Sequence, residues 1–198
     1  MTHIANVPHI LLHGITHRNS PYANPNFTPI GDPNLISTRD NFQLENGRLL
    51  GEYIPFYFGA RTPMLYVIQK GFNGLRPTPA HEITYVVTSI QQIINAKLEF
   101  IFTDGHAVDS LSSQFSNDDI AHLETLLDWS AIKTLNWKSE TDLDLKRRKQ
   151  AEFLVLGDIP ASAALGFVVY NEQANDQILK MGVEPNRVHS NKNHYFEL

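Results

Sequence analysis

Residues 146–155 read Lys-Arg-Arg-Lys-Gln-Ala-Glu-Phe-Leu-Val, with four consecutive cations leading into a carboxylate. That carboxylate, Glu152, opens an apolar run that predicts a short buried β-strand. A carboxylate at the border between a positive surface and a buried strand is well placed to act on a polyanionic substrate. The simpler alternative is that the charged run is a solvated face and that Glu152 only pairs with its neighbours.

A second unusual segment, IPFYFGARTPMLY, occupies residues 54–66. Aromatic-rich runs at 53–58 and 64–69 predict two strands on either side of a Gly-Ala-Arg-Thr-Pro turn. Pro63 has no N–H to donate to a β-ladder, so we expect sheet pairing to break there.

The composition predicts one compact domain over residues 1–198. Hydrophobic residues make up 42% of the chain and charged residues 19%, which argues against disorder. The absence of cysteine excludes a thiol nucleophile and a thiolate metal site. It also fits a reducing compartment, so we expect a cytoplasmic protein without a signal peptide or membrane span. A net charge of −5 means that any nucleic-acid binding must be local.

Helical and strand periodicities alternate along the chain, which predicts one α/β unit. Residues 3–13 predict a helix, and the Pro- and Asn-rich stretch 18–34 predicts a long functional loop. Further expected strands are 98–103, 152–156 and 166–170, and 83–89 is expected to be a strand or the start of a buried helix. A helical turn is expected at 89–95, and helices are expected at 117–127 (capped by Asn117 or Asp118) and 171–181. Residues 107–150 are expected to form a substrate-facing loop. Neither a GxGxxG nor a GxxxxGK[ST] motif is present, which disfavours a dinucleotide Rossmann fold and a P-loop enzyme.

Five pieces of the sequence, taken in order, resemble the DarT family, the toxin half of the DarT–DarG toxin–antitoxin systems. They are THIANVPHIL at 2–11, IPFYFGARTPMLY at 54–66, TDGHA at 103–107, the LDWSAI and NW region at 127–137, and RRKQAEFLV at 147–155. The resemblance implies an α+β ADP-ribosyltransferase fold with two packed β-sheets and flanking helices around an NAD cleft. It also implies transfer of ADP-ribose from NAD, with no metal, to a base of single-stranded DNA.

The resemblance also implies two catalytic residues. Breaking the nicotinamide glycosidic bond passes through an oxocarbenium-like transition state, which a carboxylate beside the ribose stabilises, and Glu152 matches this role. Arg39, after the long loop, matches a functional arginine that clamps the diphosphate and aids proton removal from the base. The alternative for Arg39 is a surface ion pair with Asp40.

The expected NAD contacts come from several parts of the chain. Thr2 and His3 match the end of the family's His-x-Thr-His entry to the NAD site, whose first histidine would precede Met1. The other expected NAD contacts are His17, Arg39, Tyr57, Met64 and Tyr66. For the aromatic residues, ordinary core packing is the alternative.

His9, His13 and His17 recur every four residues, a spacing that would place them on one helical face as metal ligands. Gly14 should end the helix before His17, so we expect no metal site.

The expected DNA contacts are Arg61, His106, Arg147 and Arg148. The DGHA form of the TDGHA motif and the divergent segment after Asn34 favour guanine over thymine as the target base. We expect single-stranded DNA and an antitoxin of the DarG kind, with a macrodomain that removes the modification, as partners. A non-catalytic nucleic-acid-binding module and an NAD glycohydrolase stay open as alternatives.

Overall fold

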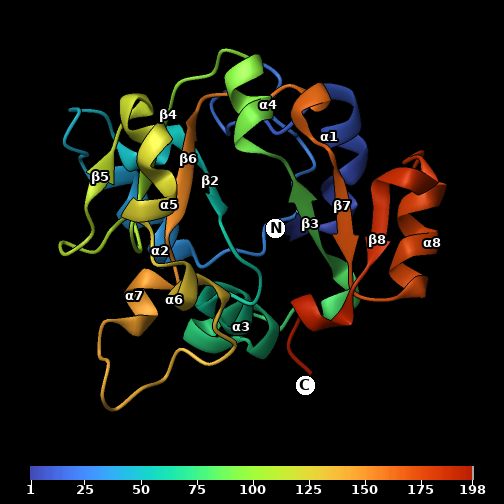
Figure 1. Ribbon diagram of the computed structural model, residues 1–198. Helices are drawn as coiled ribbons and strands as arrows, with labels where there is room; N and C mark the ends of the chain where they lie inside the picture. The colour runs from blue at the N-terminus through green and yellow to red at the C-terminus, as the bar shows by residue number, and fades with distance from the viewer. Residues whose placement is uncertain (198) are drawn as a thin grey trace. The chain divides into compact units, whose positions relative to one another are not determined.

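The computed structural model describes residues 1–197 and divides them into two compact units, each built on its own four-stranded sheet. Of the described residues, unit 1 contains 1–32, 66–98 and 157–197, and unit 2 contains 33–65 and 99–156. The predicted combination of two sheets with flanking helices is therefore confirmed (Figure 1). The expectation of one domain over 1–198 stays a prediction.

Unit 1 holds the sheet of strand order β1-β3-β7-β8. Its strands are β1 (Thr2–His3), β3 (Ile83–Val87), β7 (Gly166–Val169) and β8 (Val188–Ser190). The β1–β3 and β3–β7 pairs are antiparallel, whereas β8 lies parallel to β7. The α-helices of this unit are α1 (Val7–His13), α4 (Ile90–Asn95) and α8 (Glu172–Lys180), and α8 lies beside β8 in Figure 1.

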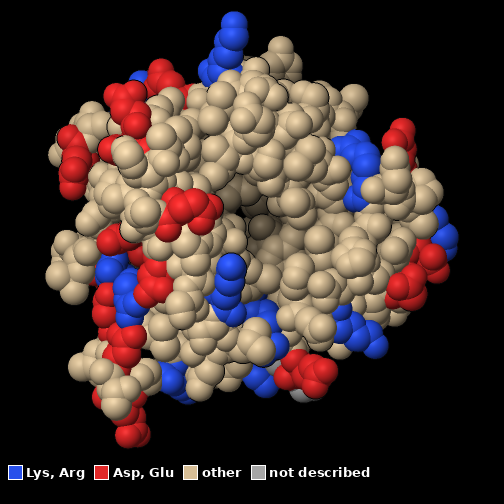
Figure 2. All heavy atoms as spheres, in the orientation of Figure 1, with Lys and Arg blue, Asp and Glu red and all other residues tan. Residues whose placement is uncertain are grey.

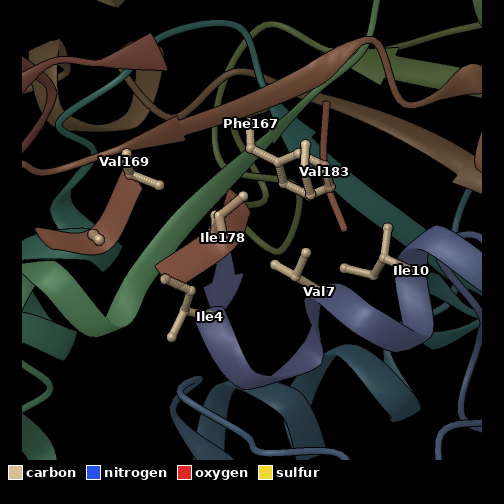
Figure 3. Close-up of a cluster of buried hydrophobic side chains, with 8 residues drawn as sticks. Ile4, Val7, Ile10, Phe167, Val169, Ile178 and Val183 are labelled. Carbon is tan, nitrogen blue, oxygen red and sulfur yellow. The ribbon is translucent and has the colours of Figure 1, made fainter. Parts of the chain in front are cut away.

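The core of unit 1 joins the two ends of the chain. Ile4, Val7 and Ile10, at the predicted helical spacing, pack with Phe167 and Ile178 (Figure 3). The predicted helix over 3–13 is only partly correct, because His3 belongs to β1 and residues 4–6 form a 3₁₀ turn. Gly14 ends α1 at a positive φ of 81°, as expected, and this separates His17 from the helical face.

Unit 2 holds the sheet of strand order β2-β6-β4-β5, which is antiparallel throughout. Its strands are β2 (Tyr53–Tyr57), β4 (Phe100–Thr103), β5 (Gln114–Phe115) and β6 (Glu152–Leu156). Its α-helices are α2 (Pro33–Asn41), α5 (Leu123–Leu126), α6 (Trp129–Lys133) and α7 (Leu145–Arg148). The central strand β6 is buried on both faces, as its continuous apolar run predicts.

The strand predicted at 64–69 is wrong, because Pro63–Lys70 forms the helix α3, which runs from unit 2 into unit 1. Pro63 stands at the first helical position, where its missing N–H costs nothing. Thr62 precedes it, and its Oγ1 accepts a hydrogen bond from the Leu65 N–H at 3.4 Å. Leu65 and Ile68 are buried at a spacing of three, which is a helical period.

Two smaller expectations are also corrected. The helix predicted at 117–127 is a 3₁₀ helix (Asn117–His122) followed by α5, and its cap is Ser116 rather than Asn117 or Asp118. The Ser116 Oγ accepts from the Asp118 N–H, and Asp119 accepts from the Ser116 N–H. Residues 107–150 are not one loop, since they contain β5, α5, α6 and α7.

The remaining 3₁₀ turns connect these elements. They are Leu50–Glu52, Phe72–Gly74, Ala80–Glu82, Ala161–Ala163, Pro185–Arg187 and Lys192–His194. Within residues 1–197, no helix is long and apolar enough to cross a membrane.

Candidate active site

Glu152 begins β6 directly opposite Tyr57, the last residue of β2. Residues that face each other in an antiparallel pair project from the same side of the sheet. Leu154, two residues further along β6, projects from that side too, into a core cluster that includes Ala107. The register therefore directs a carboxylate into a buried environment, and the Glu152 side chain is 0% exposed.

Both carboxylate oxygens of Glu152 have hydrogen-bond donors. Arg39 Nη1 donates to Oε2 at 2.8 Å, and the Ala107 backbone N–H donates to Oε1 at 3.0 Å. A buried carboxylate is costly unless it is paired and hydrogen-bonded, so this double contact is what makes the position tolerable. It also holds the carboxylate in one orientation.

Arg39 belongs to α2, and its side chain, which contacts this carboxylate, is only 12% exposed. The alternative of a surface arginine is therefore wrong. Its second terminal nitrogen, Nη2, is buried and has no hydrogen-bond partner among residues 1–197. Buried donors are nearly always satisfied, so Nη2 is available to the acceptor oxygen of a bound water or ligand. A phosphate oxygen and a base carbonyl both fit that donor.

Tyr57 lies beside the carboxylate. Burial and the negative charge of Glu152 raise the pKa of the Tyr57 phenol, so the hydroxyl stays protonated at physiological pH. A neutral phenol next to the Arg39–Glu152 pair is a hydrogen-bond donor for a bound molecule.

His106 stands on the turn that also supplies the Ala107 N–H. Its Nδ1 accepts from the Val108 N–H at 3.4 Å, which assigns the proton of the neutral ring to Nε2. Burial lowers the pKa of His106, while the negative charge of Glu152 acts in the opposite direction. At neutral pH the ring is therefore an uncharged donor through Nε2.

The 146–149 run is not the free positive patch expected from the sequence. The Arg147 guanidinium donates to Asp144 at 2.7 and 2.9 Å and to Asp104 at 2.8 Å. Arg148 pairs with three carboxylates, those of Asp128, Asp142 and Asp144. Figure 2 shows blue and red spheres interleaved on the side where α7 lies in Figure 1.

Lys149, the last cation of the run, is only 2% exposed. Its Nζ donates to the Ile132 carbonyl at the end of α6, at 3.1 Å, where a cation also complements the helix dipole. Burial and the nearby positive charge of Arg61 lower the pKa of Lys149. Arg61 itself adopts a left-handed backbone with a φ of 54°, in the turn after β2.

The other expected NAD contacts, apart from Met64 at the start of α3, belong to unit 1 and have partners there. Thr2 Oγ1 accepts from Asn6 Nδ2 at 2.9 Å, and His3 Nδ1 accepts from the Ala5 N–H at 3.1 Å. The His17 backbone N–H donates to Asp158 at 2.7 Å. Tyr66 packs edge-on against Phe196, with ring centres 5.1 Å apart.

The structure thus brings Glu152, Arg39, Tyr57 and His106 together within unit 2. Sequence reasoning missed the Ala107 N–H, because a backbone donor leaves no mark in side-chain identity. The Asp-Gly turn that directly follows a buried strand was the available signal, since such turns present backbone N–H groups. No cluster of metal-ligating side chains occurs in the part of the chain that the structure describes.

Comparison with known families gives a match over almost the whole chain. A family described as "ssDNA thymidine ADP-ribosyltransferase, DarT" matches residues 1–196. A DNA ADP-ribosyl transferase of Thermus sp. (strain 2.9) is 33% identical over 91% of this chain and 84% of its own length. One from Escherichia coli O127:H6 is 29% identical over 99% of this chain and 91% of its own length.

Solved structures agree with this match. Thermus sp. 2.9 DarT in complex with ADP-ribosylated ssDNA superposes with a TM-score of 0.83 at 30% identity, covering 98% of this chain and 93% of that one. The same protein in complex with NAD+ superposes with a TM-score of 0.78 at 31% identity, covering 98% of this chain and 94% of that one.

A longer relative matches in sequence. A DNA ADP-ribosyl transferase–DNA ADP-ribosyl glycohydrolase fusion protein of Thermosipho africanus is 28% identical over 78% of this chain and 37% of its own length. The chain therefore belongs to the DarT family of DNA ADP-ribosyltransferases.

Proposed function

We propose that this enzyme transfers ADP-ribose from NAD to a base of single-stranded DNA, with Glu152 and Arg39 as its catalytic residues. The observation that carries the assignment is the carboxylate of Glu152, fully buried and held at both oxygens by Arg39 and the Ala107 N–H. The family match over residues 1–196 supports the reaction type.

In this reaction the glycosidic bond between the ribose C1′ and nicotinamide breaks, and its electron pair leaves with nicotinamide. A ring nitrogen or exocyclic nitrogen of the base then bonds to C1′ and passes its proton to the Glu152 carboxylate. The ribose carries positive charge in the transition state, so a fixed negative charge beside it lowers the barrier. Glu152 supplies that charge without having to reorient, because both of its oxygens are already held.

Arg39 has two functions in this proposal. Its Nη1 holds Glu152, and its unsatisfied Nη2 offers a donor to an oxygen of the substrate. A diphosphate oxygen of NAD or a carbonyl of the base would complete the guanidinium, because Arg binds such oxygens in a planar fork. The same guanidinium favours loss of the base proton by stabilising the negative charge that develops on the base.

His106 is proposed to contact the target base through its Nε2 proton. Thymine and guanine both carry a ring carbonyl beside a ring N–H, and a neutral imidazole donor can bind that carbonyl. Thymine is the first base to test, because the family description names thymidine. Guanine, favoured by the DGHA motif at 104–107, is the second candidate.

The expected NAD contacts remain part of the proposal. They are Thr2, His3, His17, Tyr57, Met64 and Tyr66. The likeness to a relative solved with NAD+ supports NAD as the substrate. For DNA, Arg61, in the turn after β2, is proposed to contact phosphate. Arg147 and Arg148 are not kept as phosphate contacts, because carboxylates bind their guanidinium groups. An antitoxin that removes the modification is the proposed partner, since one relative is fused to a DNA ADP-ribosyl glycohydrolase.

Mass analysis of oligonucleotides tests the proposal directly. The protein is incubated with NAD and each of four homopolymeric single strands. The masses of the strands and of the small-molecule products are then measured by mass spectrometry. Transfer adds one ADP-ribose to a strand of one base type and releases nicotinamide. Free ADP-ribose with unchanged strands would show an NAD glycohydrolase, and intact NAD would show a non-catalytic binding module.

A further inference from the structure

The turn at residues 104–107, directly after β4, is held against the Glu152 carboxylate by a chain of hydrogen bonds. The Glu152 N–H donates to Thr103 Oγ1 at 3.3 Å, and that hydroxyl donates to the Gly105 carbonyl at 2.7 Å. Two residues later the Ala107 N–H returns to the Glu152 carboxylate. The position of this turn therefore determines how Glu152 is held on one side.

Arg147 forms hydrogen bonds to the same turn. Its backbone carbonyl accepts from the His106 N–H at 3.1 Å, and its Nη1 binds Asp104 at 2.8 Å and Ser112 Oγ at 3.2 Å. The Ser112 hydroxyl in turn donates to the His106 carbonyl at 2.8 Å. Arg147 thus reaches the turn through both its backbone and its side chain.

The fit between Arg147 and the turn is close. A methyl group added at Gly105 would overlap the Arg147 guanidinium and its side-chain stem. On the other edge of the guanidinium, Nε and Nη2 donate to the two carboxylate oxygens of Asp144 at 2.7 and 2.9 Å. This bidentate contact fixes the plane of the guanidinium, which is a geometry that Lys cannot reproduce.

We infer that Arg147 is a positioning residue for the transfer reaction: it holds the 104–107 turn so that the Ala107 N–H and the His106 ring stand correctly beside Glu152. The inference rests on the proposed function of Glu152 and His106. It assigns Arg147 to the interior of the site rather than to a DNA phosphate, because its guanidinium is already bound by two carboxylates.

Arg148 provides a matched control. It is the next residue, carries the same charge and is also bound by carboxylates, those of Asp128, Asp142 and Asp144. None of these three carboxylates belongs to the 104–107 turn. A variant at Arg148 therefore loses a similar set of ion pairs without releasing the turn.

The test compares Arg147→Ala, Arg147→Lys, Gly105→Ala and Arg148→Ala with the unchanged protein. For each folded variant, kcat and the KM for NAD are measured with saturating oligonucleotide, and oligonucleotide affinity is measured at several salt concentrations. We expect Arg147→Ala and Gly105→Ala to lower kcat by about 10- to 100-fold, since a misplacement of about 1 Å costs up to about 100-fold. The KM for NAD should stay within about threefold.

Three further results are expected. Arg147→Lys should recover only part of the rate, because it keeps the charge but not the fork. Arg148→Ala should lower the melting temperature while kcat stays within about twofold. The salt slope of DNA binding should be unchanged in Arg147→Ala and in Arg148→Ala, since a lost phosphate contact would flatten it by roughly 0.7.

A folded Arg147→Ala or Gly105→Ala protein with kcat within twofold of the unchanged enzyme overturns the inference, as does an equal loss of kcat in Arg148→Ala. A flattened salt slope with normal kcat in Arg147→Ala would instead make Arg147 a DNA contact. If Arg147→Ala does not fold, the kcat of Gly105→Ala is used to test the inference by the same criterion. A Glu152→Gln enzyme that stays active overturns this inference together with the proposed function. An inactive Glu152→Gln beside a fully active Arg147→Ala overturns only the inference about Arg147.

Discussion

Replacing Glu152 with Gln removes one charge from the site and changes its shape very little. The amide must place its NH₂ group toward either Arg39 Nη1 or the Ala107 N–H, and both are donors. One of the two hydrogen bonds is therefore lost, and the Arg39 guanidinium is left without its counter-charge. Removing one partner of a buried ion pair costs about 3–5 kcal/mol.

We expect the lower end of that range, about 3 kcal/mol, because Gln still accepts one hydrogen bond. For a protein of this size this corresponds to a melting temperature lower by about 6–12 °C. The rate should fall by about 100-fold or more, since a fixed charge aimed at the transition state typically contributes that much.

Rates of oligonucleotide modification should be measured at a temperature where circular dichroism shows both proteins to be folded. Glu152→Asp is the matched control, because it keeps the charge but moves it back by one methylene. It should retain more of the stability than of the rate. A folded Glu152→Gln protein that keeps more than about a tenth of the rate would remove Glu152 from the mechanism, given the ~100-fold contribution expected.

Three other perturbations test separate parts of the site. Arg39→Ala should lower kcat by about 100-fold and raise the KM for NAD together, whereas Arg39→Lys should rescue poorly because it lacks the planar fork, and near-normal kinetics in Arg39→Ala would argue for a different clamp. Burial lowers the pKa of His106 in the folded state, so the unfolded chain binds more protons below its ordinary pKa and stability falls as the pH drops through that window. The melting temperature should therefore fall less between pH 7.5 and pH 5 in His106→Gln than in the unchanged protein, and equal falls would contradict this. Arg61→Ala should flatten the salt dependence of oligonucleotide binding by roughly 0.7 per lost phosphate contact, and an unchanged slope would place the DNA track elsewhere.

Local patterns in the sequence predicted much of the fold. The apolar run after Glu152 predicted a short buried strand, and β6 is buried on both faces as such a run requires. The same reasoning failed at 64–69, where aromatic and β-branched residues favour a strand in isolation. Pro63 and the Thr62 cap decide for a helix there, because a helix start tolerates what a β-ladder cannot.

The site depends on contacts between residues that are distant in sequence. Arg39 and Glu152 are 113 residues apart, so only the resemblance to a family pointed to both. The charges at 146–149 predicted an exposed basic surface, because the run alone does not reveal which acids will reach it. Asp104 and Asp128 come from other elements and neutralise Arg147 and Arg148.

The register of β6 against β2, in which Glu152 lies opposite Tyr57, also determines which kinds of sequence change this enzyme can tolerate. Side chains alternate between the two faces of a strand, so moving β6 by one position against β2 would turn every one of its residues to the opposite side. Substitutions within β6 change volume or polarity at one point and leave that alternation intact. A single-residue insertion or deletion between Lys149 and Phe153 would instead shift the carboxylate away from Arg39 while every residue type is still present. Natural relatives should accordingly vary in residue identity along this strand but keep its length, and gaps in their alignment should fall in the segments before α7.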